Sequence, residues 1–357
     1  MQKLLAAAVL STCCAIAMPS QADVSLVYNN AFNKTDTQTG VIADLWIDRI
    51  QDATDGRVKI RHVPGGALLK AEGTLEGVRK GVADAGAVTL VYHIGELPIS
   101  SALAGSFDVV YGNMLDLPGV IAITRKLYEE FPEFQAEYEA LGVKPLVFVP
   151  AGQYSMIGTA KIASVDDFKD KKIRAFGSSL PKFIESVGGV PMAVAFGEMY
   201  TSLQTGVIDS VITNPTAMIP AGLHEVSKFA VTTGPGLGTS MAGATIAYTI
   251  RLQSWNKIPE KDQRLIERVS ATMEPIGAHV MTEGTAATYR GLKEKGVEVL
   301  HLSSDDVDRI AKMAPDFFAE EEKRLNGRGL PGTRIFARYR ELAEAYADGA
   351  WKPWKIE

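Results

Sequence analysis

The chain has 357 residues, of which 46% are hydrophobic, 22% charged and 8% aromatic. These fractions are those of an ordinary globular protein and exclude a disordered, collagen-like or fibrous chain. The 37 Lys and Arg residues are outnumbered by 42 Asp and Glu residues, so the formal net charge is −5. Binding to DNA or RNA is not expected, because phosphate recognition needs a concentrated positive surface and no Lys/Arg cluster is present. At about 100–200 residues per domain, the length favours two domains.

The first 22 residues have the pattern of a secretory signal peptide. Lys3 precedes an apolar run over residues 4–18, and a small-x-small triplet follows it. This run is shorter than the about 20 residues that a membrane-spanning helix needs. We therefore expect residues 1–22 to be removed and the remainder to be exported to the periplasm without itself spanning a membrane. Both cysteines of the chain lie in this segment, so no disulfide or thiolate metal site is expected afterwards.

The remaining chain begins with alternating strands and helices. Hydrophobic patterning predicts three strands and two helices between them, over residues 24–28, 42–50, 58–63, 71–80 and 82–90 in that order. A β-α-β-α-β order is typical of a parallel sheet with helices on both faces.

The same order returns later in the chain. Strands are predicted at 172–176, 192–195 and 207–212, with helices over 180–187 and 198–205 between them. Residues 75–84 and 200–209 share a pattern, in which a helix ends at a Gly and Val-x-Asp then opens a strand. This match suggests two lobes built on one plan.

The other elements would join these lobes. A strand at 142–150 leads into the second half, and a strand at 245–250 returns the chain towards the first lobe. A helix over 260–294 would be about 50 Å long at 1.5 Å per residue, which is enough to span both lobes. A last helix is predicted over 334–347. The predicted fold class is α/β with two lobes; we expect lobe I to hold residues 23–150 and about 240–275, and lobe II residues 151–239 and about 276–357.

Catalytic and metal-binding patterns are weak. The five His residues are scattered without ligand spacing, so no metal and no cofactor are expected. The acidic pair Asp166-Asp167 precedes a turn and is interpreted as a cap on a structural element. An enzyme would need a general base, for which His93 and Glu198 are only weak candidates.

Arg174 is the candidate anchor of a binding site. Two-lobed parallel α/β proteins bind ligands where the carboxyl ends of their strands face each other across a crevice, and Arg174 ends a predicted strand of the second lobe. It could form a surface ion pair there. Alternatively, its guanidinium could point into the cleft and hold a carboxylate with two parallel hydrogen bonds. Spacing alone leaves both interpretations open.

One long pattern resembles a known family. Its central part is formed by residues 165–174, 188–192 and 196–209, and segments 64–68 and 81–84 and the long late helix also fit. The chain resembles the solute-binding proteins of tripartite ATP-independent periplasmic (TRAP) transporters, the DctP-like group. The resemblance implies a two-lobed protein with hinge strands that closes around an organic acid and delivers it to a TRAP membrane permease. It also implies that Arg174 holds the ligand carboxylate.

The chain departs from the family pattern at two places. Tyr154 stands where sialic-acid-binding relatives often carry a second ligand-facing Arg, and residues 210–215 replace a more usual D-G-x-E run. Tyr contributes a hydroxyl and a ring instead of a charge. We therefore expect a ligand with one principal carboxylate and an apolar, aromatic or hydroxylated remainder. A C4-dicarboxylate or sugar acid, and a periplasmic enzyme or sensor on the same scaffold, are the alternatives.

Other residues at strand ends and in the following loops are candidates for the wall of the site. Each could instead be a core or turn residue. They are Phe32, Thr89, Tyr92, Phe176, Met192, Phe196 and Asn214.

Overall fold

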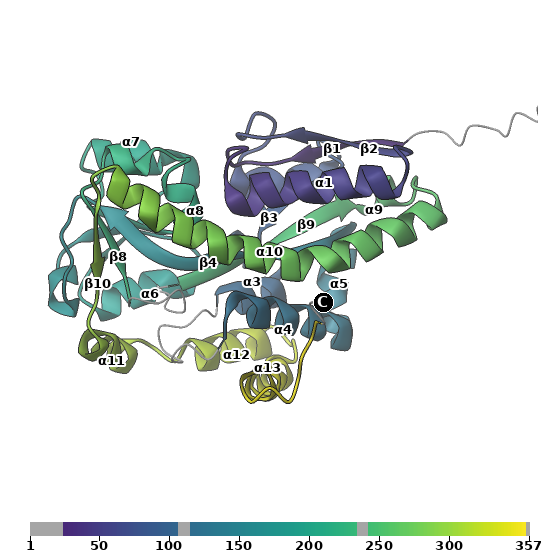
Figure 1. Ribbon diagram of the computed structural model, residues 1–357. Coiled ribbons are helices and arrows are strands. Elements are labelled where there is room, and N and C mark those ends of the chain that lie inside the picture. The colour runs from purple at the N-terminus through teal and green to yellow at the C-terminus, as the bar shows by residue number, and fades with distance from the viewer. Residues whose placement is uncertain (1–23, 106–114, 234–241, 355–357) are drawn as a thin grey trace, which may run out of the picture.

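The computed structural model describes residues 24–105, 115–233 and 242–354, and the predicted signal peptide lies outside these ranges. Two α/β lobes are joined by long strands, and a long helix crosses both of them (Figure 1). Lobe I is built on β1 (Val24–Asn29), α1 (Ile42–Ala53), β2 (Val58–Val63), α2 (Thr74–Lys80) and β3 (Ala85–Thr89). Lobe II is built on β5 (Lys172–Ala175), α6 (Ser179–Ser186), β6 (Val190–Ala193), α7 (Met199–Gln204) and β7 (Ser210–Thr213). The two predicted β-α-β-α-β units are thus confirmed.

The strand order shows how the lobes meet. It runs β2-β1-β3-β9-β4-β7-β5-β6, and within each lobe the neighbouring strands are parallel. The central strands β4 (Val143–Gly158) and β9 (Ala242–Arg251) are antiparallel to each other and pair with β7 and β3 respectively. These two strands therefore carry the chain from one lobe to the other.

In both lobes, the Asp just before the third strand makes the same reciprocal pair of hydrogen bonds. The Asp84 N–H donates to the Val27 carbonyl at 3.0 Å, and the Asp84 carboxylate accepts from the Val27 N–H at 2.8 Å. Asp209 makes the same reciprocal pair with Lys172, at 2.8 Å in both directions. The similarity of the 75–84 and 200–209 segments therefore extends to their hydrogen bonds.

Two predicted strand boundaries were wrong at this point of each lobe. The strands expected at 82–90 and 207–212 begin only at Ala85 and Ser210. Val82 and Val207, which we placed in these strands, are about half exposed, at 50% and 49%. The reason is that each helix ends in a left-handed glycine, so the chain needs a turn before its Asp can join the sheet.

The long helix α10 (Glu260–Glu294) has the predicted bounds. It packs against α1, β4 and the helix α4 (Leu117–Glu130). The Trp46 Nε1 donates to Ser270 Oγ at 3.0 Å, and the buried Glu274 carboxylate accepts from Arg125 Nε at 3.0 Å and from the Phe148 N–H at 2.9 Å. Burial raises the pKa of Glu274, while the Arg125 guanidinium lowers it. Hydrogen bonds that are largely shielded from solvent thus fix α10 to the first lobe and to β4.

The remaining helices and strands surround this framework. Of these elements only α13 was predicted, and it begins two residues earlier than the predicted helix. They are α3 (Pro98–Gly105), α5 (Pro132–Glu139), α8 (Pro215–Met218), β8 (Phe229–Thr232), α9 (Leu252–Trp255), β10 (Glu298–His301), α11 (Ser304–Met313), α12 (Phe317–Gly327) and α13 (Gly332–Ala347).

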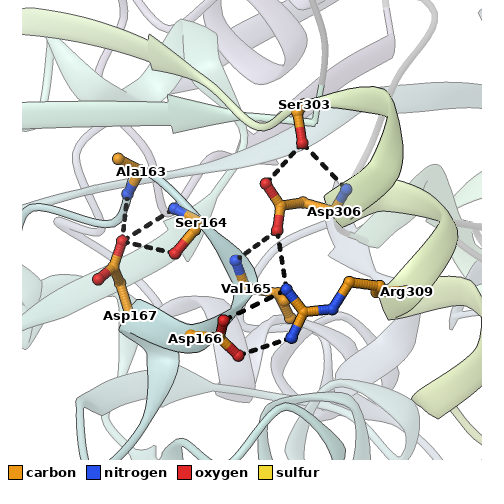
Figure 2. A network of polar contacts seen from close by, with 8 residues as sticks. All are labelled: Ala163, Ser164, Val165, Asp166, Asp167, Ser303, Asp306 and Arg309. Atoms are coloured by element: carbon orange, nitrogen blue, oxygen red, sulfur yellow. Dashed lines mark hydrogen bonds and ion pairs between the residues drawn. The ribbon is translucent and has the colours of Figure 1, made fainter.

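A polar network fixes α11 to lobe II (Figure 2). The Asp306 carboxylate accepts from the Val165 N–H at 3.1 Å and from Ser303 Oγ at 2.6 Å. Asp167, interpreted from sequence as a cap, accepts from the N–H and the hydroxyl of Ser164 in a capping box. The short helical turn Val165–Phe168, which precedes β5, is therefore held by the capping box at its start and by Asp306 of α11.

Among residues 24–105, 115–233 and 242–354, no helix is both long enough and apolar enough to cross a membrane. The same residues contain no group of three or more His, Cys, Asp or Glu side chains arranged to hold a metal ion.

Candidate ligand-binding site

The loops at the carboxyl ends of the strands of both lobes enclose a cavity of about 480 Å³. From lobe I it is lined by residues 31–33 and by loop residues that follow β2, and from lobe II by residues 195–200. The arrangement agrees with the rule that parallel α/β proteins bind ligands outside the carboxyl ends of their strands. Arg174 and Tyr154 are buried, with 2% and 6% of their surface exposed, and they are not among the residues that line this cavity.

Arg174 is a buried cation at the end of β5, with 2% of its surface exposed. Its Nε donates to the Val194 carbonyl at 3.0 Å, and its Nη1 donates to the Ile212 carbonyl at 3.3 Å. Its Nη2 donates to the Tyr92 hydroxyl of lobe I at 3.2 Å. Among the described residues no carboxylate forms an ion pair with it. Backbone carbonyls of lobe II thus orient this guanidinium, while its charge has no anionic partner within the described part of the chain.

Aromatic rings surround the guanidinium. Arg174 Cζ lies 4.5 Å from the centre of the Phe176 ring, which is cation–π distance. The Phe176 ring centre lies 6.1 Å from that of Tyr92 and 5.4 Å from that of Tyr154. Burial raises the pKa of the Tyr154 hydroxyl far above its ordinary value, the Tyr92 hydroxyl raises it further and the Arg174 charge lowers it. Tyr92, Tyr154, Arg174 and Phe176, which were each named from sequence as candidate site residues, therefore lie together in one cluster.

Two predicted site residues occupy equivalent places at the ends of β3 and β7. Thr89 and Asn214 each stand five residues after the Asp that opens the strand of their lobe. Asn214 also caps α8, because its Oδ1 accepts from the Thr216 N–H at 2.8 Å and from Thr216 Oγ1 at 2.7 Å. The Asn214 Nδ2 and the Thr89 Oγ1 are buried and have no hydrogen-bond partner among the described residues. Both side chains therefore keep polar atoms that a bound molecule can satisfy.

Two aromatic side chains from opposite lobes meet at the cavity, which charged residues such as Lys70, Glu72 and Glu198 also line. Phe32 of lobe I and Phe196 of lobe II line the cavity and meet edge to face, with ring centres 4.5 Å apart. Met192 lies on β6, half-buried, in the same apolar cluster that Phe196 joins in lobe II. The structure thus brings Phe32 and Phe196 together across the cleft, whereas Met192 packs against the lobe II cluster and does not line the cavity.

Sequence reasoning did not single out Asp36, which is 1% exposed. Its Oδ1 accepts from the Thr39 N–H at 3.1 Å and from Thr39 Oγ1 at 3.0 Å, whereas its Oδ2 has no hydrogen-bond partner among the described residues. Burial raises the pKa of the Asp36 carboxyl from 3.8 to about 6, although the Thr39 hydrogen bonds and the nearby Asn214 amide lower it. In sequence, an Asp before a helix is simply a typical cap. Only the packing of the two lobes brings the Asn214 amide close to this carboxyl.

Two lobes joined by crossing strands, with buried polar and aromatic side chains where the lobes meet, define the class of two-lobed α/β binding proteins. The sequence model described as bacterial extracellular solute-binding protein, family 7, matches residues 29–323. The chain belongs to this family, whose members include the DctP-like solute-binding proteins of TRAP transporters. A relative, the C4-dicarboxylate-binding periplasmic protein DctP of Rhodobacter capsulatus, is 25% identical over 294 residues, covering 80% of this chain and 83% of the relative.

Solved structures share the fold. A TRAP solute-binding protein from Rhodoferax ferrireducens, in complex with copurified benzoate, matches with a TM-score of 0.83 at 16% identity, covering 92% of this chain and 100% of that one. A marine metagenome TRAP solute-binding protein specific for aromatic acid ligands, in complex with 3-hydroxybenzoate, matches with a TM-score of 0.81 at 17% identity, covering 91% and 99%. The predicted family and two-lobed fold are confirmed.

Proposed function

We propose that this protein is an extracytoplasmic solute-binding protein that captures a small organic carboxylate between its lobes and delivers it to a TRAP membrane permease. The buried guanidinium of Arg174, without an anionic partner in the described residues, carries this proposal. A buried charge is costly unless it is paired and hydrogen-bonded. A ligand carboxylate supplies the missing charge.

The hydrogen bonds of Arg174 leave room for such a ligand. Three of the five N–H groups of the guanidinium are used, one on each nitrogen. One N–H therefore remains on each terminal nitrogen, which is the pair that binds a carboxylate with two parallel bonds. The anchor would be held in place by lobe II and reached by Tyr92 of lobe I when the lobes close.

The rest of the site favours one principal carboxylate with an apolar, aromatic or hydroxylated remainder. Phe176 and Tyr154 supply rings beside the anchor, Phe32 and Phe196 supply apolar surface farther out, and Asn214 and Thr89 supply polar atoms. The relatives named above bind benzoate, 3-hydroxybenzoate or a C4-dicarboxylate, all of which carry a carboxylate.

Location and domain division belong to the same proposal. Residues 1–22 would direct export to the periplasm, and residues 23–150 with about 240–275 would close on 151–239 with about 276–357. In this proposal the protein binds its ligand without changing it chemically.

The test is ligand binding by the wild type and by Arg174 variants. A thermal-shift screen of organic acids, followed by calorimetry, should give hits among carboxylates, since binding only the native state raises the melting temperature. Arg174→Ala should lose about 2–5 kcal/mol, or roughly thirty- to several-thousandfold in affinity, because the ligand charge would be buried unpaired. Arg174→Lys should recover only part of this, because it lacks the two-pronged geometry.

Arg309→Ala is the matched control, because it removes an exposed guanidinium of α11 that pairs with Asp166. It should bind like the wild type. Unchanged affinity in Arg174→Ala, or hits only among uncharged sugars or amines, would refute the proposal.

A further inference from the structure

The helix α12 is in contact with both lobes. Its Phe317 belongs to a buried apolar cluster that also contains Ile99 of α3 in lobe I and Phe183 of α6 in lobe II. The helix lies outside both β-α-β-α-β units and follows them in the chain. A helix placed in this way can hold two lobes in one arrangement, provided that specific contacts reach each of them.

On the lobe II side, the specific contact is made by Glu321. Its Oε1 accepts a hydrogen bond from Ser178 Oγ at 2.7 Å. Ser178 follows β5 and stands four residues after Arg174, the proposed anchor. Glu321 is 4% exposed, so this bond is shielded from water, and a shielded hydrogen bond to a charged group is stronger than one at the surface.

The Glu321 carboxylate also continues the connection to lobe I. Its Oε2 accepts from Arg324 Nε at 2.6 Å, one helical turn away. Arg324 Nη2 donates in turn to the Pro98 carbonyl at 2.9 Å, at the start of α3. Pro98 stands six residues after Tyr92, whose hydroxyl accepts from Arg174. An unbroken chain of hydrogen bonds therefore joins the segment after Arg174 to the segment after Tyr92.

The start of α3 is itself fixed within lobe I. Glu137 of α5 accepts from the N–H groups of Ile99 at 2.8 Å and of Ser100 at 2.9 Å. These are N–H groups that the first turn of a helix leaves without partners, so Glu137 caps α3. Arg324 thus contacts a segment that is held to the rest of its lobe.

The bonds between Glu321 and Arg324 form a largely buried ion pair, with side chains that are 6% and 22% exposed. Taking two charges out of water carries a large free-energy cost, and apolar residues of similar volume often replace such a pair without loss of stability. The best-attested use of buried polar groups is to fix one arrangement of the elements that they join. Glu321 and Arg324 fit this use, because their other bonds go to opposite lobes.

We infer that Glu321 and Arg324 form an interlobe clasp, which holds the two lobes in this arrangement and so positions Arg174 and Tyr92 for each other. Both are positioning residues, since they act through the segments that follow Arg174 and Tyr92 and do not line the cavity. The clasp needs no ligand, and the inference goes beyond the proposed function without depending on it.

The test measures whether a substitution in one lobe changes the other lobe. Ser178→Ala removes only the lobe II end of the clasp, and hydrogen–deuterium exchange of the full-length, unliganded chain is followed by mass spectrometry. Amides of residues 93–101 in lobe I should exchange about tenfold faster, because one hydrogen bond to a charged group no longer opposes their opening. Arg324→Gln removes the lobe I end and should likewise speed exchange of residues 173–180 in lobe II.

Two further variants control for local effects. Ser178→Thr keeps the hydroxyl and should exchange like the wild type. Ser186→Ala removes a hydroxyl of the same lobe whose bond stays within α6, to the Phe183 carbonyl at 2.7 Å, and should leave lobe I unchanged. Exchange of residues 58–63, in the edge strand β2 of lobe I, should be the same in all variants, which shows that the fold as a whole is intact.

Every outcome decides the inference. Faster exchange that is confined to the lobe carrying the substitution, or no change in either lobe, would refute the clasp. Uniformly faster exchange, β2 included, would mean that the ion pair serves overall stability alone, and this too would refute it. None of these measurements uses a ligand, so the proposed function is decided separately, by the binding of carboxylates and its loss in Arg174→Ala.

Discussion

The hydroxyl of Tyr92 accepts a hydrogen bond from Nη2 of Arg174 at 3.2 Å, and this bond joins the two lobes at the centre of the candidate site. Tyr92 ends the short helical turn after β3 of lobe I, whereas Arg174 lies on β5 of lobe II. The proposed anchor of the ligand is therefore also a contact that closes the protein. Occupancy of the site and closure of the lobes would then depend on the same guanidinium.

Tyr92→Phe should weaken ligand binding by about tenfold, close to 1.4 kcal/mol, because closure loses a hydrogen bond to a charged group. Isothermal calorimetry with the best acid from the screen measures the effect. Tyr128→Phe is a suitable control, since Tyr128 of α4 packs against aromatic residues of α5 and β4 and does not line the cavity. Wild-type affinity in Tyr92→Phe would show that the bond is absent from the liganded closed state.

Phe32 and Phe196 should act together in retaining the ligand. Their edge-to-face contact joins the two lobes at the cavity, and such pairs contribute about 0.5–1.5 kcal/mol beyond the area they bury. Replacing either residue with Ala should therefore speed dissociation about three- to tenfold in stopped-flow experiments. The double variant should dissociate little faster than either single one, because one contact is lost in all three. Fully additive effects would mean that the rings act independently.

The pH dependence of stability should report the burial of Asp36. Its pKa is raised from 3.8 to about 6 in the folded protein, so the folded state holds this proton more tightly than the unfolded state. The contribution of Asp36 to the free energy of unfolding is therefore present at about pH 4 and is lost as the pH rises through 6. Two pH units correspond to at most about 3 kcal/mol.

This prediction is checked by urea unfolding of the unliganded protein at pH 4.5 and pH 7. Asp36→Asn cannot ionise, so relative to the wild type it should be more stable at pH 7 than at pH 4.5. Other carboxylates titrate in both proteins, and the comparison cancels them. An equal difference between the two proteins at both pH values would show that Asp36 titrates normally.

Two interactions of the network in Figure 2, one buried and one exposed, should contribute differently to the free energy of unfolding. Asp306 is 9% exposed and accepts the buried Val165 N–H, whereas the Arg309–Asp166 ion pair has side chains that are 49% and 75% exposed. Asp306→Ala should lower the free energy of unfolding by about 1–3 kcal/mol, since the N–H would be left unpaired. Arg309→Ala should cost less than about 1 kcal/mol, because water screens the pair. Urea denaturation distinguishes them, and equal losses would contradict this account.

Local patterns were sufficient for much of the fold. The two β-α-β-α-β units and the bounds of α10 follow from periodicity and from Gly and Pro positions, which act within a few residues. The strand starts at Ala85 and Ser210 were misjudged, because the apolar Val82 and Val207 read as strand although a glycine turn holds them outside the sheet. The helices α3, α4 and α5 and most of the short helices and strands after β7 were missed, because their signals are too weak to read from one sequence.

The site divides in the same way. The sequence by itself determined the two-lobed class, the family and the position of Arg174 at the end of a strand. Each of these depends on patterns of residues that are close together along the chain. Only the tertiary structure decided that this guanidinium is buried without an acidic partner in the described residues, that Tyr92 reaches it from the other lobe, and that the Asn214 amide lies close to Asp36. These contacts join residues 82 and 178 positions apart, and no local pattern encodes such a pairing, because closure of the lobes creates it.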